Sequence, residues 1–259
     1  GASFEGVTKP FIDGLGERLA IWIDHHDHVL HAEYAHDARF VLRTKAEHGA
    51  CPEMVTPERV QQAGQVDTVC CHTDFDGLCS AAKWIRGGVE PYAGADDDAR
   101  AIDTRLGKPS ELANTLDRAL RARPRDDALC GLIVRFLAES CADTSLFRQI
   151  EKASEALRVR EDEARRIAKG YDVRNEIALV EIPVGHAPYD KTLLLLLGQE
   201  RARVSIVIDP NTLTVAARFD SGIDLLSQLG LQGGMPTVVS VAPKQRDEVL
   251  AKLGWPQNG

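Results

Sequence analysis

The sequence predicts an α/β protein of two lobes, a larger one with a parallel sheet and a smaller one with a mixed sheet, joined by a helical connector. Three observations predict this fold class. Short apolar runs at residues 19–23 and 66–71 have the length and β-branched content of buried strands. Residues 110–169 follow a helical pattern almost throughout. Strand-like runs then resume at residues 177–182.

The domain boundaries follow from these patterns. We expect a first lobe at residues 1–120, a connector at residues 121–170 and a second lobe at residues 171–259. Within the connector, residues 151–169 are dense in Glu, Lys and Arg, which is typical of a solvated helix.

The first lobe is predicted to alternate strands and helices. Its expected elements are a helix at residues 8–19, a strand running from 19 to Asp24, strands at 39–42, 66–71 and 89–92, and helices at 78–85 and 96–104. The order of strand, acidic loop and helix around residue 74 is half of a βαβ unit.

The second lobe is predicted to contain its own sheet. Its expected elements are strands at residues 177–182, 204–208, 213–218 and 237–241, and helices at 191–197 and 223–229. The turn residues Asp209-Pro210-Asn211 join two of these strands into an antiparallel pair.

Charge and cysteine content restrict the function classes. Net charge is -8, from 31 basic and 39 acidic residues, and no basic stripe is present. This balance disfavours binding to long duplex nucleic acid and favours a short phosphorylated substrate. The six cysteines form no CxxC pair, so we expect reduced, mostly buried thiols and a cytoplasmic location. No apolar run is long enough to span a bilayer, and we expect no membrane partner.

Two motifs carry the chemistry. Asp24-His25-His26 and His72-Thr73-Asp74-Phe75-Asp76-Gly77 each follow a predicted strand. Both should therefore lie at strand ends, where α/β proteins place their active sites. Acids and imidazoles brought together repel one another unless a cation lies between them, so the motifs predict a divalent-metal site. Simple roles as turn acids and structural histidines are the alternative.

These motifs resemble the signature of the DHH phosphoesterase superfamily, which includes RecJ-type exonucleases, oligoribonuclease-phosphatases and cyclic-dinucleotide phosphodiesterases. Residues 189–253, with Ala217-Arg218-Phe219-Asp220-Ser221-Gly222 and the pair Gly233-Gly234, resemble the family's C-terminal DHHA1 domain. The resemblance covers most of the chain and implies a DHH-like catalytic lobe and a DHHA1-like substrate lobe.

Three features depart from the family pattern. The triplet precedes the HxDxDG motif here, as a circular permutation would produce, whether natural or engineered. The family's metal-bridging aspartate lies on the strand before the triplet, which is where this sequence begins. Either that residue was lost from the start of the sequence or another acid replaces it; without a replacement, metal binding should weaken and one site should stay empty. Gly233-Gly234 is followed by Met235 rather than histidine, which leaves a histidine contact with substrate open.

The resemblance implies a role for each motif residue. His72 and Asp74 would bind one Mn²⁺, and Asp76, His25 and Asp103 a second, with Mg²⁺ as the alternative ion. His26 would contact the scissile phosphate or act as an acid, and Asp24 would orient His25. Arg218, Gly233 and Gly234 would bind a terminal phosphate of the substrate; the alternative is a surface arginine and a plain loop.

The expected function is manganese-dependent hydrolysis of phosphodiester bonds in short oligonucleotides or nucleotides, including cyclic dinucleotides, with two ions activating water. One alternative is a catalytically impaired family member that binds a nucleotide as a sensor. Another is a pyrophosphatase or polyphosphatase. A homodimer is compatible with the sequence, and His28, His31, His36 and His48 are interpreted as solvated loop residues.

Overall fold

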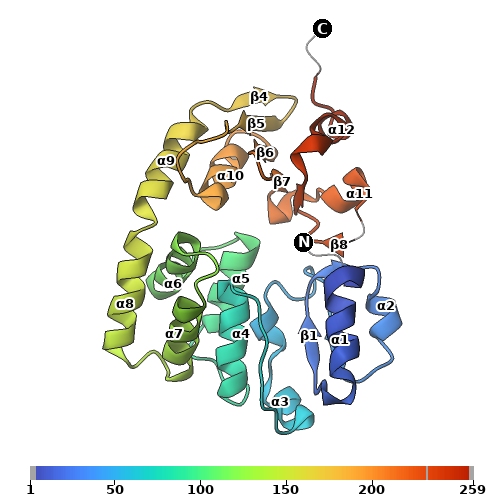
Figure 1. The fold of residues 1–259 in the computed structure, drawn as a ribbon, viewed down its shortest axis with the longest axis vertical. Coiled ribbons are helices and arrows are strands. Elements are labelled where there is room, and N and C mark those ends of the chain that lie inside the picture. The colour runs from blue at the N-terminus through green and yellow to red at the C-terminus, as the bar shows by residue number, and fades with distance from the viewer. Residues whose placement is uncertain (1–3, 232, 257–259) are drawn as a thin grey trace. The chain divides into compact units, whose positions relative to one another are not determined.

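The computed structural model describes residues 4–231 and 233–256. It consists of two compact units, Gly1–Lys152 and Ala153–Gly259. The division lies within the segment expected as the connector. The first unit contains a small parallel sheet and the second a five-stranded mixed sheet, with helices in both (Figure 1). The α/β, two-lobed fold class is therefore confirmed.

The first unit is mostly helical. Its elements are η1 (Phe4–Thr8), α1 (Lys9–Leu15), η2 (Gly16–Arg18), β1 (Trp22–Asp24), β2 (Asp27–His28), α2 (His31–Tyr34), β3 (Phe40–Leu42), η3 (Cys51–Met54), α3 (Pro57–Ala63), α4 (Phe75–Ile85), α5 (Ala95–Thr104), α6 (Glu111–Ala122), α7 (Asp127–Ala138) and α8 (Thr144–Glu155), which continues into the second unit.

Strands β1 and β3 pair in parallel, with Asp24 opposite Leu42. Parallel strands end at the same edge, so the chain leaves both strands on the side where the Asp24-His25-His26 triplet begins. Helix α4 lies beside α5 and α7 and buries Leu78 and Cys79 between them. This packing brings the start of α4 and the end of α5 into the same region as the triplet.

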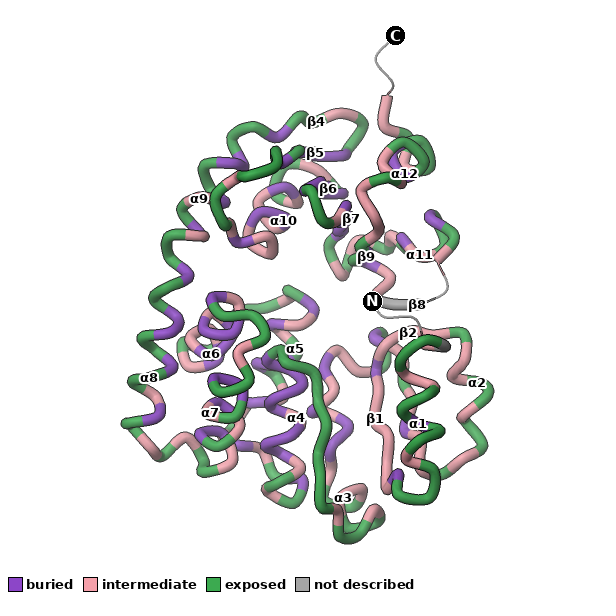
Figure 2. The backbone as a smooth tube through the Cα atoms, in the orientation of Figure 1, coloured by how far each residue is buried: buried purple, intermediate pink, exposed green. Residues whose placement is uncertain are grey.

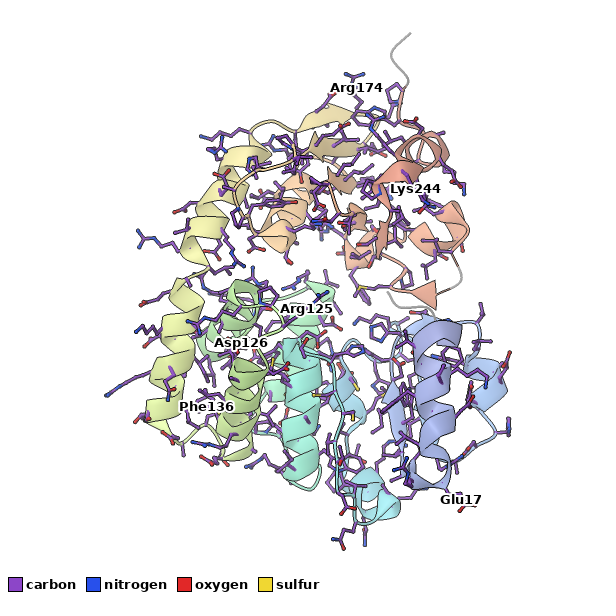
Figure 3. All side chains as sticks on the ribbon, in the orientation of Figure 1. Glu17, Arg125, Asp126, Phe136, Arg174 and Lys244 are labelled. Atoms are coloured by element: carbon purple, nitrogen blue, oxygen red, sulfur yellow. The ribbon has the colours of Figure 1, made fainter. Side chains whose placement is uncertain are left out.

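Helices α6, α7 and α8 are separated by short breaks. Pro124 cannot continue α6, and Asp126 begins α7 by accepting a hydrogen bond from the Leu129 N–H at 3.0 Å. The rings of Phe136 on α7 and Phe147 on α8 stack with their centroids 5.6 Å apart, on the side of α7 that faces α8 (Figure 3).

Two strands predicted in this unit do not form. Residues 66–71 are extended and mostly exposed along the tube that leads from α3 to α4 (Figure 2), and no described residue hydrogen-bonds to their backbone. A strand exists only through pairing, so a β-favouring sequence without a neighbour stays unpaired. Residues 89–92 form a loop for the same reason. Cys70 and Cys71 are consequently exposed, contrary to the prediction of buried thiols, whereas Cys79 and Cys130 are buried.

The second unit contains the rest of the chain. Its elements are α9 (Arg158–Ala168), β4 (Asp172–Arg174), β5 (Ile177–Glu181), α10 (Lys191–Gln199), β6 (Val204–Ile208), β7 (Leu213–Ala217), η4 (Phe219–Ser221), α11 (Leu225–Leu229), β8 (Gly233–Gly234), β9 (Val238–Val241), η5 (Pro243–Gln245) and α12 (Arg246–Lys252). The predicted solvated helix at residues 151–169 is interrupted between α8 and α9, and α9 buries Ala164 and Ile167.

The five strands of the second unit run in the order β4-β5-β6-β7-β9. Only β5 and β6 are parallel, and α10 connects them as a crossover helix. Alternate residues of β5 face opposite sides: Ala178 and Val180 pack with α9 and α10, while Ile177 and Leu179 pack with α11 and α12. The sheet is thus covered on both faces.

None of the helices in the described part of the chain has the length and apolar content that crossing a bilayer requires.

Candidate metal centre

The start of α4 is shaped by the HxDxDG motif. Asp74 precedes the helix, and its Oδ1 accepts a hydrogen bond from the Gly77 N–H at 3.0 Å. A Cβ atom at Gly77 would lie 2.4 Å from the carbonyl oxygen of His72, so only glycine permits this approach. Asp76 therefore points from the first turn into the unit, where it is 6% exposed. Its Oδ1 accepts a hydrogen bond from the Cys51 N–H at 2.7 Å.

Three of the predicted metal ligands converge on one point. His25 from the end of β1, Asp76 from α4 and Asp103 from α5 offer ligand atoms that all lie within 4.8 Å of one another. His25 Nε2 is 3.3 Å from Asp76 Oδ2 and 3.6 Å from Asp103 Oδ2. We call these three residues the His25 cluster. His25 is 1% exposed and Asp76 is also buried, whereas Asp103 is half-buried.

The orientation of the His25 ring is set by its other nitrogen. Nδ1 lies 3.0 Å from the carbonyl oxygen of His48, which can only accept, so Nδ1 carries the proton and donates. In the neutral ring, Nε2 then has a lone pair directed at the two carboxylates. This is the arrangement of a metal-binding histidine, whose second nitrogen is fixed by a backbone carbonyl.

A lysine that the sequence did not point out lies in the same place. Lys45, just after β3, is 3% exposed. Its Nζ contacts Asp103 Oδ2 and lies 3.4 Å from His25 Nε2. Burial lowers the pKa of Lys45 to about 8, although the negative charges of Asp76 and Asp74 favour its charged form.

The predicted catalytic residues, Asp24 and His26, form a hydrogen-bonded pair. Asp24 Oδ1 accepts hydrogen bonds from the His26 backbone N–H at 2.9 Å and from its ring Nδ1 at 2.8 Å. Burial raises the pKa of Asp24, but the hydrogen bonds and charge of His26 outweigh it and bring the pKa to about 2. Asp24 thus orients His26, where the resemblance implied His25, because the His48 carbonyl already holds that ring.

His72 and Asp74 lie outside the His25 cluster. The ring of His72 is 5.5 Å from that of His26, centroid to centroid, so the two motifs meet at the triplet. Asp74 acts on Lys45 through its charge, and one of its oxygens is engaged at the start of α4. Their roles as ligands of a first ion stay a prediction.

The predicted substrate residues belong to the second unit. Arg218 follows β7 and is exposed, and its guanidinium donates to Asp220 through Nε at 3.0 Å and through Nη2 at 2.8 Å. Gly233 and Gly234 form the short strand β8. The side chain of Arg218 lies at the surface, where a phosphate can compete with Asp220 for it.

Sequence reasoning missed Lys45, the His48 carbonyl and the Cys51 N–H. None of them has a motif signal, because two act through the backbone and a single lysine in a loop is ordinary. His48, interpreted as a solvated residue, is half-buried, and its side chain pairs with Glu53 at 3.2 Å. Burial raises the pKa of Cys51 to about 12, so this thiol beside the cluster is a poor nucleophile.

No protein-family model matches the chain. No curated protein sequence matches it either. Among solved structures, the chain is similar to the pGpG-specific phosphodiesterase PggH from Vibrio cholerae, with 14% identity and a TM-score of 0.43. The similarity covers 61% of this chain and 64% of that chain, which is less than two thirds of its length. A likeness at this level does not establish a common activity.

Proposed function

We propose that this chain is a divalent-metal-dependent phosphoesterase that hydrolyses phosphodiester bonds in short oligonucleotides or nucleotides. The observation that carries the proposal is the meeting of His25, Asp76 and Asp103 from three distant parts of the chain. Gathering two carboxylates around an imidazole lone pair in a buried place is costly unless a cation compensates. Such arrangements persist where the cation has a function.

The donor set fits a hard divalent ion. Two carboxylates and one imidazole, with no thiolate among them, suit Mn²⁺ or Mg²⁺. His25, Asp76 and Asp103 would hold this ion, and His72 and Asp74 are the proposed ligands of a second. Bound ions would supply Lewis-acid chemistry, stabilising charge on a phosphoryl oxygen and making water a better nucleophile at neutral pH.

The pair of Asp24 and His26 supplies the remaining chemistry in this proposal. Asp24 holds the proton of His26 on Nδ1, which leaves Nε2 to face a ligand. From there, His26 would bind a phosphoryl oxygen or, when doubly protonated, give the Nε2 proton to the leaving oxygen. Asp24, whose pKa is about 2, is charged at neutral pH and so remains an acceptor for the Nδ1–H of His26.

The class of substrate follows from charge. A chain of net charge -8 does not neutralise many phosphates, so a short oligonucleotide or a nucleotide fits better than a long duplex. Arg218 is the proposed contact for a terminal phosphate, because its guanidinium is exposed and already arranged for a planar, doubly hydrogen-bonded anion.

One observation favours a second candidate, a nucleotide-binding module with little or no turnover. The ammonium of Lys45 already brings a positive charge to the His25 cluster, which lessens the need for an ion there.

The test is hydrolysis by chelator-treated protein of a 5′-phosphorylated dinucleotide, a cyclic dinucleotide and inorganic pyrophosphate, with and without Mn²⁺. We expect nucleotide hydrolysis only after Mn²⁺ is added. Asp76→Asn should lower kcat/KM more than about a hundredfold, because it removes a ligand charge while Oδ1 still accepts from Cys51. Asp67→Asn, at an exposed position in the preceding loop, is the matched control and should change nothing.

Activity that persists in chelator, or in Asp76→Asn, contradicts the proposal. Phosphate release from pyrophosphate alone would identify a pyrophosphatase. Nucleotide affinity without turnover at saturating Mn²⁺ would identify the binding module.

A further inference from the structure

Lys45 lies where an ion in the His25 cluster would lie. Its ammonium contacts Asp103 Oδ2, one of the three ligand atoms, and approaches His25 Nε2, another, at 3.4 Å. Both contacts are made by a side chain that is almost completely removed from solvent. A lysine held like this is fixed by its charge, because a buried ammonium needs acceptors on more than one side.

The geometry of His25 explains why a cation is needed. Its Nδ1 is committed to the His48 carbonyl, so the lone pair of Nε2 faces Asp76 Oδ2 and Asp103 Oδ2 at 3.3 and 3.6 Å. In the neutral ring, which is the form that binds a metal, these three atoms are all acceptors and no proton lies between them. The N–H groups of Lys45 supply the missing donors and the missing charge.

We propose that Lys45 is a resident cation of the His25 cluster, which occupies the position of a divalent ion and must withdraw before Mn²⁺ binds there. This inference rests on the proposed function only in taking the cluster as a metal site. The consequence is that the native chain binds Mn²⁺ at the cluster more weakly than its ligands alone would permit. Lys45 is accordingly a positioning residue that sets metal occupancy.

The chain offers a matched lysine for comparison. Lys83 on α4 is 5% exposed and donates to Asp96 Oδ2 at 2.5 Å and to the Pro52 carbonyl at 2.9 Å. No imidazole takes part in this pair. Lys83 and Lys45 are thus equally buried and both paired with an aspartate, but only Lys45 faces metal-ligand atoms.

The experiment is a titration of chelator-treated protein with Mn²⁺. Calorimetry measures the heat of binding, and electron paramagnetic resonance measures the concentration of the free ion. Lys45→Met should bind Mn²⁺ at least about tenfold more tightly than the native chain, or bind one ion more, since the competing charge is gone. Its melting temperature should be lower than that of the native chain in chelator and should recover with Mn²⁺. Lys83→Met should lose stability that Mn²⁺ does not restore, with native Mn²⁺ affinity.

A second variant covers the case in which Lys45→Met does not fold. Lys45→Gln keeps a polar side chain with N–H donors and removes the positive charge, and it should also raise Mn²⁺ affinity. Equal Mn²⁺ affinity and stoichiometry in the native chain and in the folded Lys45 variants would overturn the inference. Its failure is distinguishable from failure of the proposed function, because Mn²⁺ binding is measured without substrate: tighter binding without hydrolysis keeps the inference and removes the phosphoesterase.

Discussion

The two units show what a motif predicts well and what it does not. In the first unit, residues from two motifs and a helix end meet in a buried cluster, and each side chain is fixed by partners from other segments. In the second unit, Arg218 is exposed, and its guanidinium donates to Asp220, two residues away. A site held by many distant contacts is rigid, whereas a surface arginine has a geometry that the ligand can change.

After Asp76, the largest effect is expected at Asp24, which pairs with His26 beside the His25 cluster. Asp24→Asn keeps an oxygen near the His26 ring but removes the negative charge that accepts from Nδ1. We expect kcat of the Mn²⁺-dependent hydrolysis to fall about ten- to a hundredfold with KM nearly unchanged. Steady-state kinetics at several pH values would measure kcat and KM of the native chain and of the variant. An unchanged kcat would assign Asp24 a purely structural role.

A smaller effect is expected at Arg218. Arg218→Ala should raise KM for a substrate with a terminal phosphate about tenfold and leave kcat unchanged, since it removes one charged contact. Arg246→Ala is the control, because it breaks another exposed ion pair of the same unit, with Glu181. Both variants should keep the native melting temperature. Equal KM values in the two variants would exclude Arg218 from binding.

The smallest effect concerns stability and pH in the second unit. Burial raises the pKa of Asp209, but hydrogen bonds from Lys191 and from the Asn211 and Thr212 N–H groups lower it to about 2. The contribution of the Asp209 charge to the free energy of unfolding is therefore fully present above the ordinary pKa of 3.8 and is lost as the pH falls through 2. Asp209→Asn should lower the free energy of unfolding by about 1 kcal/mol at pH 6, a value that allows for solvent screening.

Urea unfolding at several pH values measures this contribution. The difference between native chain and Asp209→Asn should shrink as the pH approaches 2. A difference that is constant with pH would show that Asp209 acts through shape rather than through its charge.

The sequence predicted those features that depend on local interactions. Strand β6 and the turn at Asp209 follow from a short apolar run and an aspartate that accepts from nearby N–H groups. The start of α4 follows from Asp74 and from Gly77, because no residue with a Cβ atom fits at position 77 beside His72. The fold class was predictable because these local patterns recur in order along the chain.

Features that depend on distant partners were not predictable. Residues 66–71 have a strand composition but lack a neighbour among the described residues, so no strand forms. Asp24 pairs with His26 rather than with His25, because Nδ1 of His25 already donates to the distant His48 carbonyl. Lys45 joins the cluster only because the chain after β3 folds back over the edge where β1 ends.

The position of Mn²⁺ tests the central claim most directly. Crystals grown in chelator and then soaked in Mn²⁺ would give an anomalous difference map that locates each ion. We predict a peak about 2.0–2.5 Å from His25 Nε2 and from the Asp76 and Asp103 carboxylates, with Lys45 Nζ moved away. A map with no peak at the His25 cluster, and with Lys45 still bound to Asp103, would contradict it.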